Sequence, residues 1–231
     1  VFAVAATAGS TNFGAIDELD AIARCCEERG IWMHVDGAYG GAAALLPALR
    51  SRFEGIERAD SFVVDPHKWL FAPFDCAALV YRDPAVARAA HTQHAEYLDV
   101  IHLQREWNPS DFAYHLTRRA RGLPFWFSLA TYGTDAYAAA VDAGLTMARA
   151  AADLIRVHPR LELVLEPELS VVVFRRLDWA AADYQQWTET LLENQVAFVV
   201  PSSFAGETVL RFCFVHPRTS IADVQAILAT L

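Results

Sequence analysis

The segment over residues 61–69 places a lysine where it could act as a nucleophile. An apolar, β-branched run ends in the sequence DPHK, residues 65–68. The pattern predicts a buried strand that presents ionisable side chains at its C-terminal end. There Lys68 would be partly desolvated, which favours the neutral amine and lets it attack an aldehyde to form an imine. A surface lysine in a loop is the alternative interpretation.

Asp36, 32 residues upstream (68 − 36), gives Lys68 a chemical partner. It ends a second apolar run, residues 30–36, and glycine follows it. One acid at one strand end could be a helix cap or a metal ligand. An aspartate and a lysine at successive strand ends instead suit a pyridoxal phosphate site: the lysine holds the cofactor, and the aspartate keeps the pyridine nitrogen protonated.

Two segments carry a family resemblance: HVDGAYGG, residues 34–41, and DPHKWLFAPFDCAAL, residues 65–79. They resemble the pyridoxal phosphate-dependent group II amino acid decarboxylases, most of all the aromatic-L-amino-acid decarboxylase branch. The resemblance extends from residues 7–11 to the C-terminus. It implies an α/β fold of the fold type I, aspartate aminotransferase-like class, with pyridoxal 5'-phosphate as cofactor.

The resemblance also assigns roles to individual residues. It makes Lys68 the imine lysine and Asp36 the partner of the ring nitrogen, with His67 over the imine as a second catalytic residue. Further cofactor contacts would come from Thr11 at the ring edge, from Ala38, and from Gly133, which would approach the phosphate of a partner subunit. Asp65 is a further candidate for a cofactor contact, but it departs from the branch, whose members often have asparagine there, and a second carboxylate near a phosphate is repulsive.

Two further positions bear on the chemistry. Arg211 lies in an apolar strand-like run and could reach a substrate carboxylate, although a structural ion pair is an equal alternative. The resemblance places a mobile catalytic loop over about residues 91–112, and Pro109 stands where decarboxylating members have a proton-donating tyrosine. Tyr97 could replace that tyrosine. The His and Cys spacings predict no metal site.

The elements that must position these residues alternate strand and helix. An apolar run over residues 1–6, a helical pattern stopped by Gly30, and the run ending at Asp36 predict a βαβ unit in a parallel sheet. We assign residues 1–158 to the C-terminal part of a large cofactor-binding domain. Residues 159–231 would form a small α/β domain, with strands near 161–165, 170–176, 196–200 and 209–215 and a last helix opened by a capping box at Ser220 and Asp223.

The composition suggests that other chains cover this one. The 231 residues are 54% hydrophobic with a mean hydropathy of +0.19, which is unusually apolar for a soluble chain. By the resemblance, the N-terminal half of the large domain is absent, and with it a ring-stacking histidine and much of the phosphate loop. We therefore expect a complementary N-terminal chain or segment as a partner, and a homodimer of complete units.

Charge and cysteine content indicate which partners and which cellular compartment to expect. With 28 acidic against 19 basic residues, a net charge of −9 argues against nucleic acid or an anionic membrane as partner. No apolar run approaches the ~20 residues that span a bilayer. Four cysteines, expected as small core residues, suit a reducing, cytoplasmic location. The arginines at 118, 119 and 121 are expected at a solvated or interface helix start.

These observations favour decarboxylation of a small-molecule L-amino acid substrate, by preference an aromatic one, to the amine and CO₂. Three alternatives stay open. An aldehyde synthase would suit the missing loop tyrosine, and an aminotransferase on the same fold would suit a carboxylate-binding Arg211. The third is an inactive structural or binding half-chain.

Overall fold

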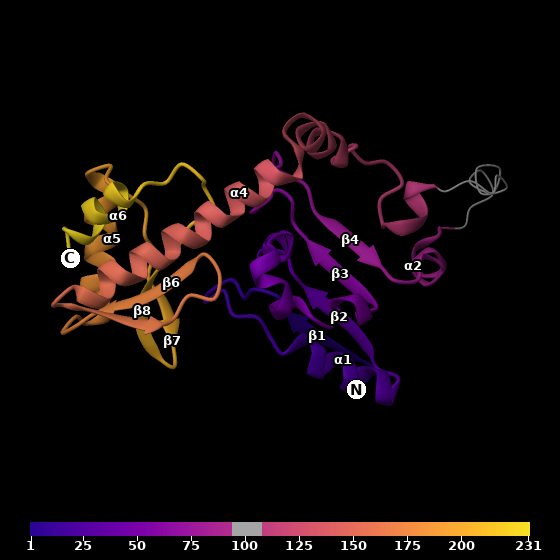
Figure 1. The fold of residues 1–231 in the computed structure, drawn as a ribbon, viewed down its shortest axis with the longest axis horizontal. Coiled ribbons are helices and arrows are strands. Elements are labelled where there is room, and N and C mark those ends of the chain that lie inside the picture. The colour runs from indigo at the N-terminus through magenta and orange to yellow at the C-terminus, as the bar shows by residue number, and fades with distance from the viewer. Residues whose placement is uncertain (94–107) are drawn as a thin grey trace.

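The first sheet carries the candidate site. The computed structural model describes residues 1–93 and 108–231. Four strands in the order β1-β2-β3-β4 form the sheet: β1 (Ala3–Thr7), β2 (Trp32–Asp36), β3 (Ser61–Val64) and β4 (Ala78–Tyr81). The first three are parallel and β4 is antiparallel to β3. The C-terminal ends of β1, β2 and β3 therefore lie at one edge of the sheet (Figure 1).

Helix α1 (Leu19–Arg29) connects β1 to β2 and confirms the predicted βαβ unit. Leu19, Ala23 and Cys26 recur at helical spacing and are all buried. The helix ends at Gly30, whose left-handed backbone (φ 62°) lets its N–H reach the last helical carbonyls. Glycine adopts this conformation without the steric cost of a side chain.

Short helices fill the connections that follow β2 and β4. They are η1 (Gly40–Leu45), η2 (Pro47–Phe53), η3 (Ile56–Arg58), α2 (Pro84–His91) and η4 (Pro109–Phe112). Pro109 opens η4, where a missing N–H costs nothing. Tyr97, and with it residues 94–107 of the expected mobile loop, lies outside the described residues, so the role of that loop stays a prediction.

The long helix α4 (Gly122–Val157) joins the two halves of the chain (Figure 1). It breaks at Gly133, whose backbone (φ 76°, ψ 163°) is not helical. Beyond the break, Val141 and Leu145 belong to the core of the first sheet, whereas Ala152 and Ile155 belong to the core of the second. One helix face therefore ties both cores together.

The second sheet is antiparallel, in the order β5-β6-β8-β7. Its elements are β5 (Leu161–Leu165), β6 (Val171–Arg176), β7 (Ser202–Phe204) and β8 (Glu207–Cys213), with α5 (Ala181–Glu193) and α6 (Ile221–Leu228). The predicted capping box of α6 is confirmed, since Ser220 and Asp223 bond reciprocally.

Two expectations from the sequence are wrong. Residues 196–200 form no strand: the Val199 carbonyl accepts from the Thr188 hydroxyl (2.7 Å) and Pro201 has no N–H to donate, so pairing begins only at β7. Of the four cysteines, which we expected in the core, Cys25 and Cys213 are exposed. Among the described residues, no helix is long and apolar enough to cross a bilayer.

Candidate active site

Lys68 lies just beyond β3, in a tight turn. Its N–H donates to the Asp65 carbonyl (2.9 Å), and its Nζ forms an ion pair with the Asp65 carboxylate (2.8 Å). The desolvation that we expected is not seen, because the sheet edge is open here and the Lys68 side chain is 42% exposed. Lys68 is nevertheless distinctive in sequence: it is the only lysine, and the other 18 basic residues are arginines.

Asp36 ends β2, the neighbour of β3, and its carboxylate accepts from the Ala38 N–H (3.0 Å). The Ala38 carbonyl in turn accepts from the Asp65 N–H (3.0 Å). This bond links the loop after Asp36 to the loop that carries Lys68. The structure thus brings Asp36, Ala38, Asp65 and Lys68 together at the C-terminal edge of two adjacent parallel strands.

His67 is oriented by the backbone of Cys76. Its Nδ1 lies 2.6 Å from the Cys76 carbonyl oxygen and 3.0 Å from the Cys76 amide nitrogen. These contacts fix the imidazole through its Nδ1 edge and turn the opposite edge, with Nε2, away from that backbone. The Phe74 ring packs edge-on against the imidazole at 5.1 Å. His67 is therefore held in place beside Lys68 by contacts local to the loop.

Thr11 lies in the loop after β1, at the same sheet edge. That loop is joined to β2, since the Ala8 N–H donates to the Asp36 carbonyl (2.8 Å). Arg211 of β8 reaches it from the second sheet and donates from Nη1 to the Thr11 carbonyl (2.9 Å). The sequence left Arg211 between a substrate carboxylate and an ion pair, and the contact found is instead a hydrogen bond to backbone.

Gly133 is placed apart from these residues. It interrupts α4, and no heavy atom of the described chain lies within 4 Å of the point where a Cβ would be, apart from its chain neighbours and the backbone of its own helix. Tyr132 beside it is 69% exposed. This position matches a residue that faces outward, so its expected contact with the phosphate of a partner subunit stays a prediction.

The arginines at 118, 119 and 121 are not simply solvated before the helix, because each makes a hydrogen bond within the chain. Arg119 donates to one oxygen of Asp75 (2.6 Å) and Arg121 to the other (2.9 Å), while Arg118 donates to the Pro109 carbonyl (2.7 Å). Desolvation would raise the pKa of Asp75, but the hydrogen bond and charge of Arg121, with Arg119, hold it below its ordinary value. The cluster anchors the segment before α4 to the loop after Lys68.

Sequence reasoning missed Tyr39 and Trp69 as site-supporting residues. The two rings stack at 5.1 Å with an interplanar angle of 13°, and Trp69 is fully buried directly after Lys68. The Tyr39 hydroxyl lies 2.5 Å from the hydroxyl of the buried Ser170. The sequence feature that could have pointed to Tyr39 is its position three residues after Asp36 in the HVDGAYGG segment.

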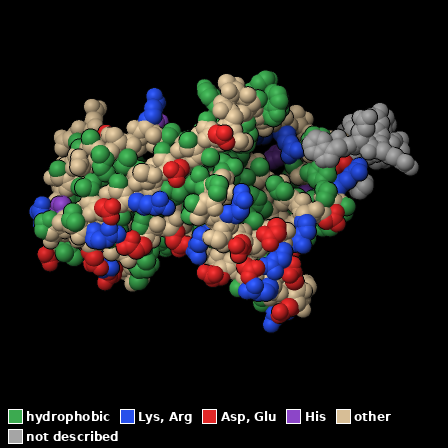
Figure 2. Space-filling view, in the orientation of Figure 1, with side chains coloured by type: hydrophobic (Ala, Val, Ile, Leu, Met, Phe, Trp, Pro, Cys, Tyr) green, Lys and Arg blue, Asp and Glu red, His purple; other side chains and the backbone are tan. Residues whose placement is uncertain are grey.

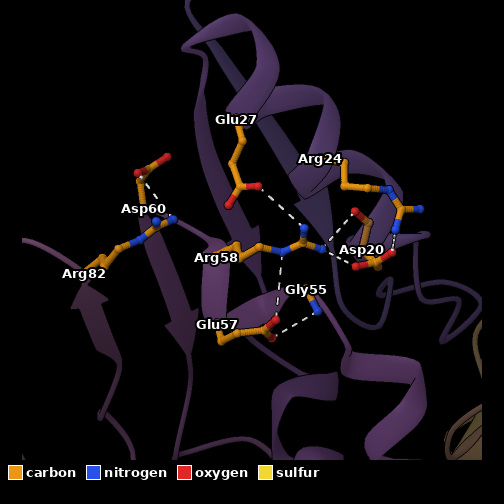
Figure 3. A network of polar contacts seen from close by, with 8 residues as sticks. All are labelled: Asp20, Arg24, Glu27, Gly55, Glu57, Arg58, Asp60 and Arg82. Atoms are coloured by element: carbon orange, nitrogen blue, oxygen red, sulfur yellow. Dashed lines mark hydrogen bonds and ion pairs between the residues drawn. The ribbon is translucent and has the colours of Figure 1, made fainter.

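Two cavities lie away from this edge. The first, about 310 Å³, opens near the N-terminal ends of β2 and β3 and is bordered by Arg58, Asp60 and Arg82. Figure 3 shows its polar network, in which Arg58 pairs with Asp20, Glu27 and Glu57. The second, about 400 Å³, lies beside the second sheet. Among the described residues, no group of three or more His, Cys, Asp and Glu could hold a metal ion.

The groups at the sheet edge fit two parts of pyridoxal phosphate, its aldehyde and its ring nitrogen. Lys68 offers an amine to the aldehyde, and Asp36 offers a carboxylate to the ring nitrogen, from neighbouring parallel strands whose loops are hydrogen-bonded to each other. An α/β fold with a lysine and an aspartate at neighbouring strand ends is the kind of site that can hold pyridoxal phosphate.

Comparisons with known proteins narrow the class to a family. The model of the pyridoxal-dependent decarboxylase conserved domain matches residues 1–177, and the chain belongs to this family. It is 30% identical to the aromatic-L-amino-acid decarboxylase of Bacillus atrophaeus over 98% of its length, and 37% identical to the L-2,4-diaminobutyrate decarboxylase of Acinetobacter baumannii over 76%. The chain spans 49% and 34% of those proteins.

Solved structures agree with the sequence comparison. A crystal structure of Oryza sativa TDC with PLP and tryptamine superposes with a TM-score of 0.90 at 30% identity. The superposition covers 99% of this chain and 50% of that one. The predicted family, fold class and cofactor are thereby confirmed, and the chain corresponds to about half of such a protein.

Proposed function

We propose that this chain supplies the lysine-bearing part of a pyridoxal phosphate-dependent decarboxylase that converts an aromatic L-amino acid to its amine and CO₂. The observation that carries the proposal is the hydrogen-bonded pair of strand ends that presents Lys68 and Asp36 at one edge. Residues 1–158 would form part of the cofactor domain and residues 159–231 the small domain.

Each residue at the edge would have a distinct task. When bound, pyridoxal phosphate supplies an aldehyde that captures amines and a protonated ring that accepts the electron pair of the breaking bond. Lys68 would hold the cofactor and later deliver a proton, and Asp36 would keep the proton on the ring nitrogen. His67, fixed through Nδ1, would present its other edge as a second proton donor. Thr11 and Ala38 would border the ring.

Asp65 has a task of its own in this scheme. Its carboxylate holds the Lys68 ammonium at 2.8 Å, so it would orient the lysine at the sheet edge rather than contact a phosphate, which it would repel. Asp65, which stands where branch members often have asparagine, would thus act on Lys68.

The aromatic substrate is supported by relatives named for aromatic amino acids, found in bacteria and in mammals. Relatives named for histidine and for diaminobutyrate match as well. The substrate side of the pocket would come from residues outside this chain, because Lys68 and Asp36 lie at an open edge.

A complementary N-terminal segment and a homodimer of complete units would cover this chain. The exposed apolar residues support this assembly. Leu79 and Val80 of β4 are 50% and 54% exposed, and Trp126 and Phe127 of α4 are 58% and 60% exposed. Figure 2 shows hydrophobic side chains around the projecting first part of α4, whereas acidic and basic side chains gather over α1. Apolar patches of this kind mark protein contacts.

The test uses the fact that the chain has one lysine. We would incubate it with pyridoxal phosphate, alone and with the N-terminal half of the Bacillus relative, reduce with borohydride and map the labelled peptide by mass spectrometry. We expect the label on Lys68 and a visible absorbance that Lys68→Ala abolishes. Labelling confined to the terminal amine in both preparations would refute the assignment.

Product analysis separates the alternatives. Amine and CO₂ in equal amounts support the decarboxylase, whereas aldehyde with ammonia and peroxide would identify an aldehyde synthase, the alternative that Pro109 favours. A keto acid would identify an aminotransferase. Cofactor labelling without any product, in the presence of the complementary half, would identify a binding subunit.

A further inference from the structure

Tyr39 lies where the site-bearing loops meet. It is three residues beyond Asp36, and its ring stacks on Trp69 at 5.1 Å. Trp69 follows Lys68 directly and is fully buried, so it cannot move without displacing its neighbours. The Tyr39 ring therefore contacts the lysine loop while its backbone belongs to the aspartate loop.

The hydroxyl of Tyr39 reaches the other half of the chain. It accepts from the Ser170 N–H (3.1 Å) and lies 2.5 Å from the Ser170 hydroxyl. Ser170 is fully buried and directly precedes β6 of the second sheet. Burial, with Cys213 nearby, raises the pKa of Tyr39 despite the Ser170 hydrogen bonds and the charge of Arg211. The phenol thus keeps its proton and its bonds at physiological pH.

Gly40 closes the same junction from the side of the β1 loop. A Cβ there would overlap the Ala8 carbonyl oxygen and lie 2.8 Å from the Gly9 Cα and 2.7 Å from the Leu169 side chain. Gly9 belongs to the loop that carries Thr11, and Leu169 precedes Ser170. The residue pair Tyr39–Gly40 thus touches the loops of Thr11 and Lys68 and the start of β6.

We propose that Tyr39 is a positioning residue that couples the second sheet to the placement of Lys68. The chain of contacts runs from Ser170 through the Tyr39 hydroxyl and ring to Trp69, and from there along the backbone to Lys68. The functional meaning rests on the proposed function, because it presumes that Lys68 holds the cofactor. Any movement of the second sheet would then alter how Lys68 is presented.

The experiment reads Lys68 directly. Reductive methylation of the full chain with ¹³C-formaldehyde gives one lysine methyl signal by NMR, separate from that of the terminal amine, because Lys68 is the only lysine. We would compare the wild type with Tyr39→Phe, which keeps the stacked ring and removes the hydroxyl. The matched control is Tyr137→Phe, which removes the hydrogen bond that the buried Tyr137 donates to the half-buried Ser128 (2.7 Å) inside α4.

We expect Tyr39→Phe to shift or broaden the Lys68 signal and to slow borohydride-trapped labelling by pyridoxal phosphate several-fold. Tyr137→Phe should match the wild type in both. An unchanged Lys68 signal in Tyr39→Phe, or an equal change in the control, overturns the proposal. If Tyr39→Phe does not fold by circular dichroism, Ser170→Ala gives the same reading, because it removes the hydroxyl partner and keeps the stacked rings.

The two proposals fail in different ways. Absence of label on Lys68 in the wild type would contradict the cofactor role, while the methyl signal would still report the coupling. A normal label together with an insensitive methyl signal would contradict only the role of Tyr39.

Discussion

Gly144 is the residue whose replacement tests most sharply how the two sheets are joined. It lies in the middle of α4, where alanine normally stabilises a helix by about 1 kcal/mol over glycine. Here, however, a Cβ would lie 2.5 Å from the Phe214 carbonyl oxygen and 3.2 Å from Cζ2 of Trp69. A backbone oxygen and a buried indole cannot rotate away, so the helix must shift.

The magnitude follows from these two opposing effects. Overpacking of a tight core costs roughly 1–3 kcal/mol, and the close backbone contact puts Gly144→Ala toward the upper end. After the helix gain is subtracted, we expect a net loss of about 1–2 kcal/mol, or a melting temperature lower by roughly 2–8 °C for a chain of this size. Differential scanning calorimetry and urea unfolding would measure it.

The control is Gly122→Ala, in the same helix. Among the described residues, no heavy atom lies within 4 Å of a Cβ at Gly122, apart from its chain neighbours and the backbone of its own helix, so this variant should equal or exceed the wild type in stability. Gly144→Ala as stable as Gly122→Ala would refute the crossing of α4 over Phe214 and Trp69. That result would also argue against packing of α4 on Trp69, the residue that follows Lys68.

Two further predictions concern the second half of the chain. Ser220→Ala should lower the free energy of unfolding by about 1 kcal/mol in urea titrations, because it removes the helix cap of α6. Hydrogen bonds from the Ser220 N–H and hydroxyl lower the pKa of Asp223 below its ordinary value of 3.8. The stabilisation that these bonds give should therefore be present above pH 3.8 and disappear as the pH falls through the lowered pKa. A stability difference between wild type and Ser220→Ala that does not shrink in acid would contradict this. Burial first, then Arg160 and Arg176, lower the pKa of His158 below 6.5, so the unfolded state binds the proton more readily and stability should fall as the pH drops below 6.5. His158→Gln should lose less stability than the wild type over that interval, and equal losses would show that His158 carries none of it.

The local patterns were readable because they depend on neighbouring residues. The βαβ unit, the stop at Gly30 and the capping box at Ser220 each follow from spacing and backbone preference within one or two elements. The strand expected at residues 196–200 failed because Thr188, from another element, bonds the Val199 carbonyl. Pairing between distant segments has no signature in either segment alone.

Arg211 shows the same limit at the candidate site. Its position in an apolar strand indicated a buried or functional charge, but its contact with the Thr11 carbonyl joins residues 200 positions apart. Side-chain exposure was also not predictable from the local sequence. The pattern implied a desolvated Lys68, whereas its side chain at the sheet edge is 42% exposed.

The sequence by itself determined which residues are candidates for the chemistry, because these residues follow apolar strands whose parallel order brings their C-terminal ends to one edge. Lys68 and Asp36 could therefore be named from their types and spacing, and the family resemblance added His67. Only the tertiary structure showed the long-range contacts beside them, namely the Tyr39–Trp69 stack and the Ser170 hydrogen bonds. The physical reason is that ring stacking and buried hydrogen bonds need atoms within a few ångströms of one another, and these atoms come from segments up to 131 residues apart.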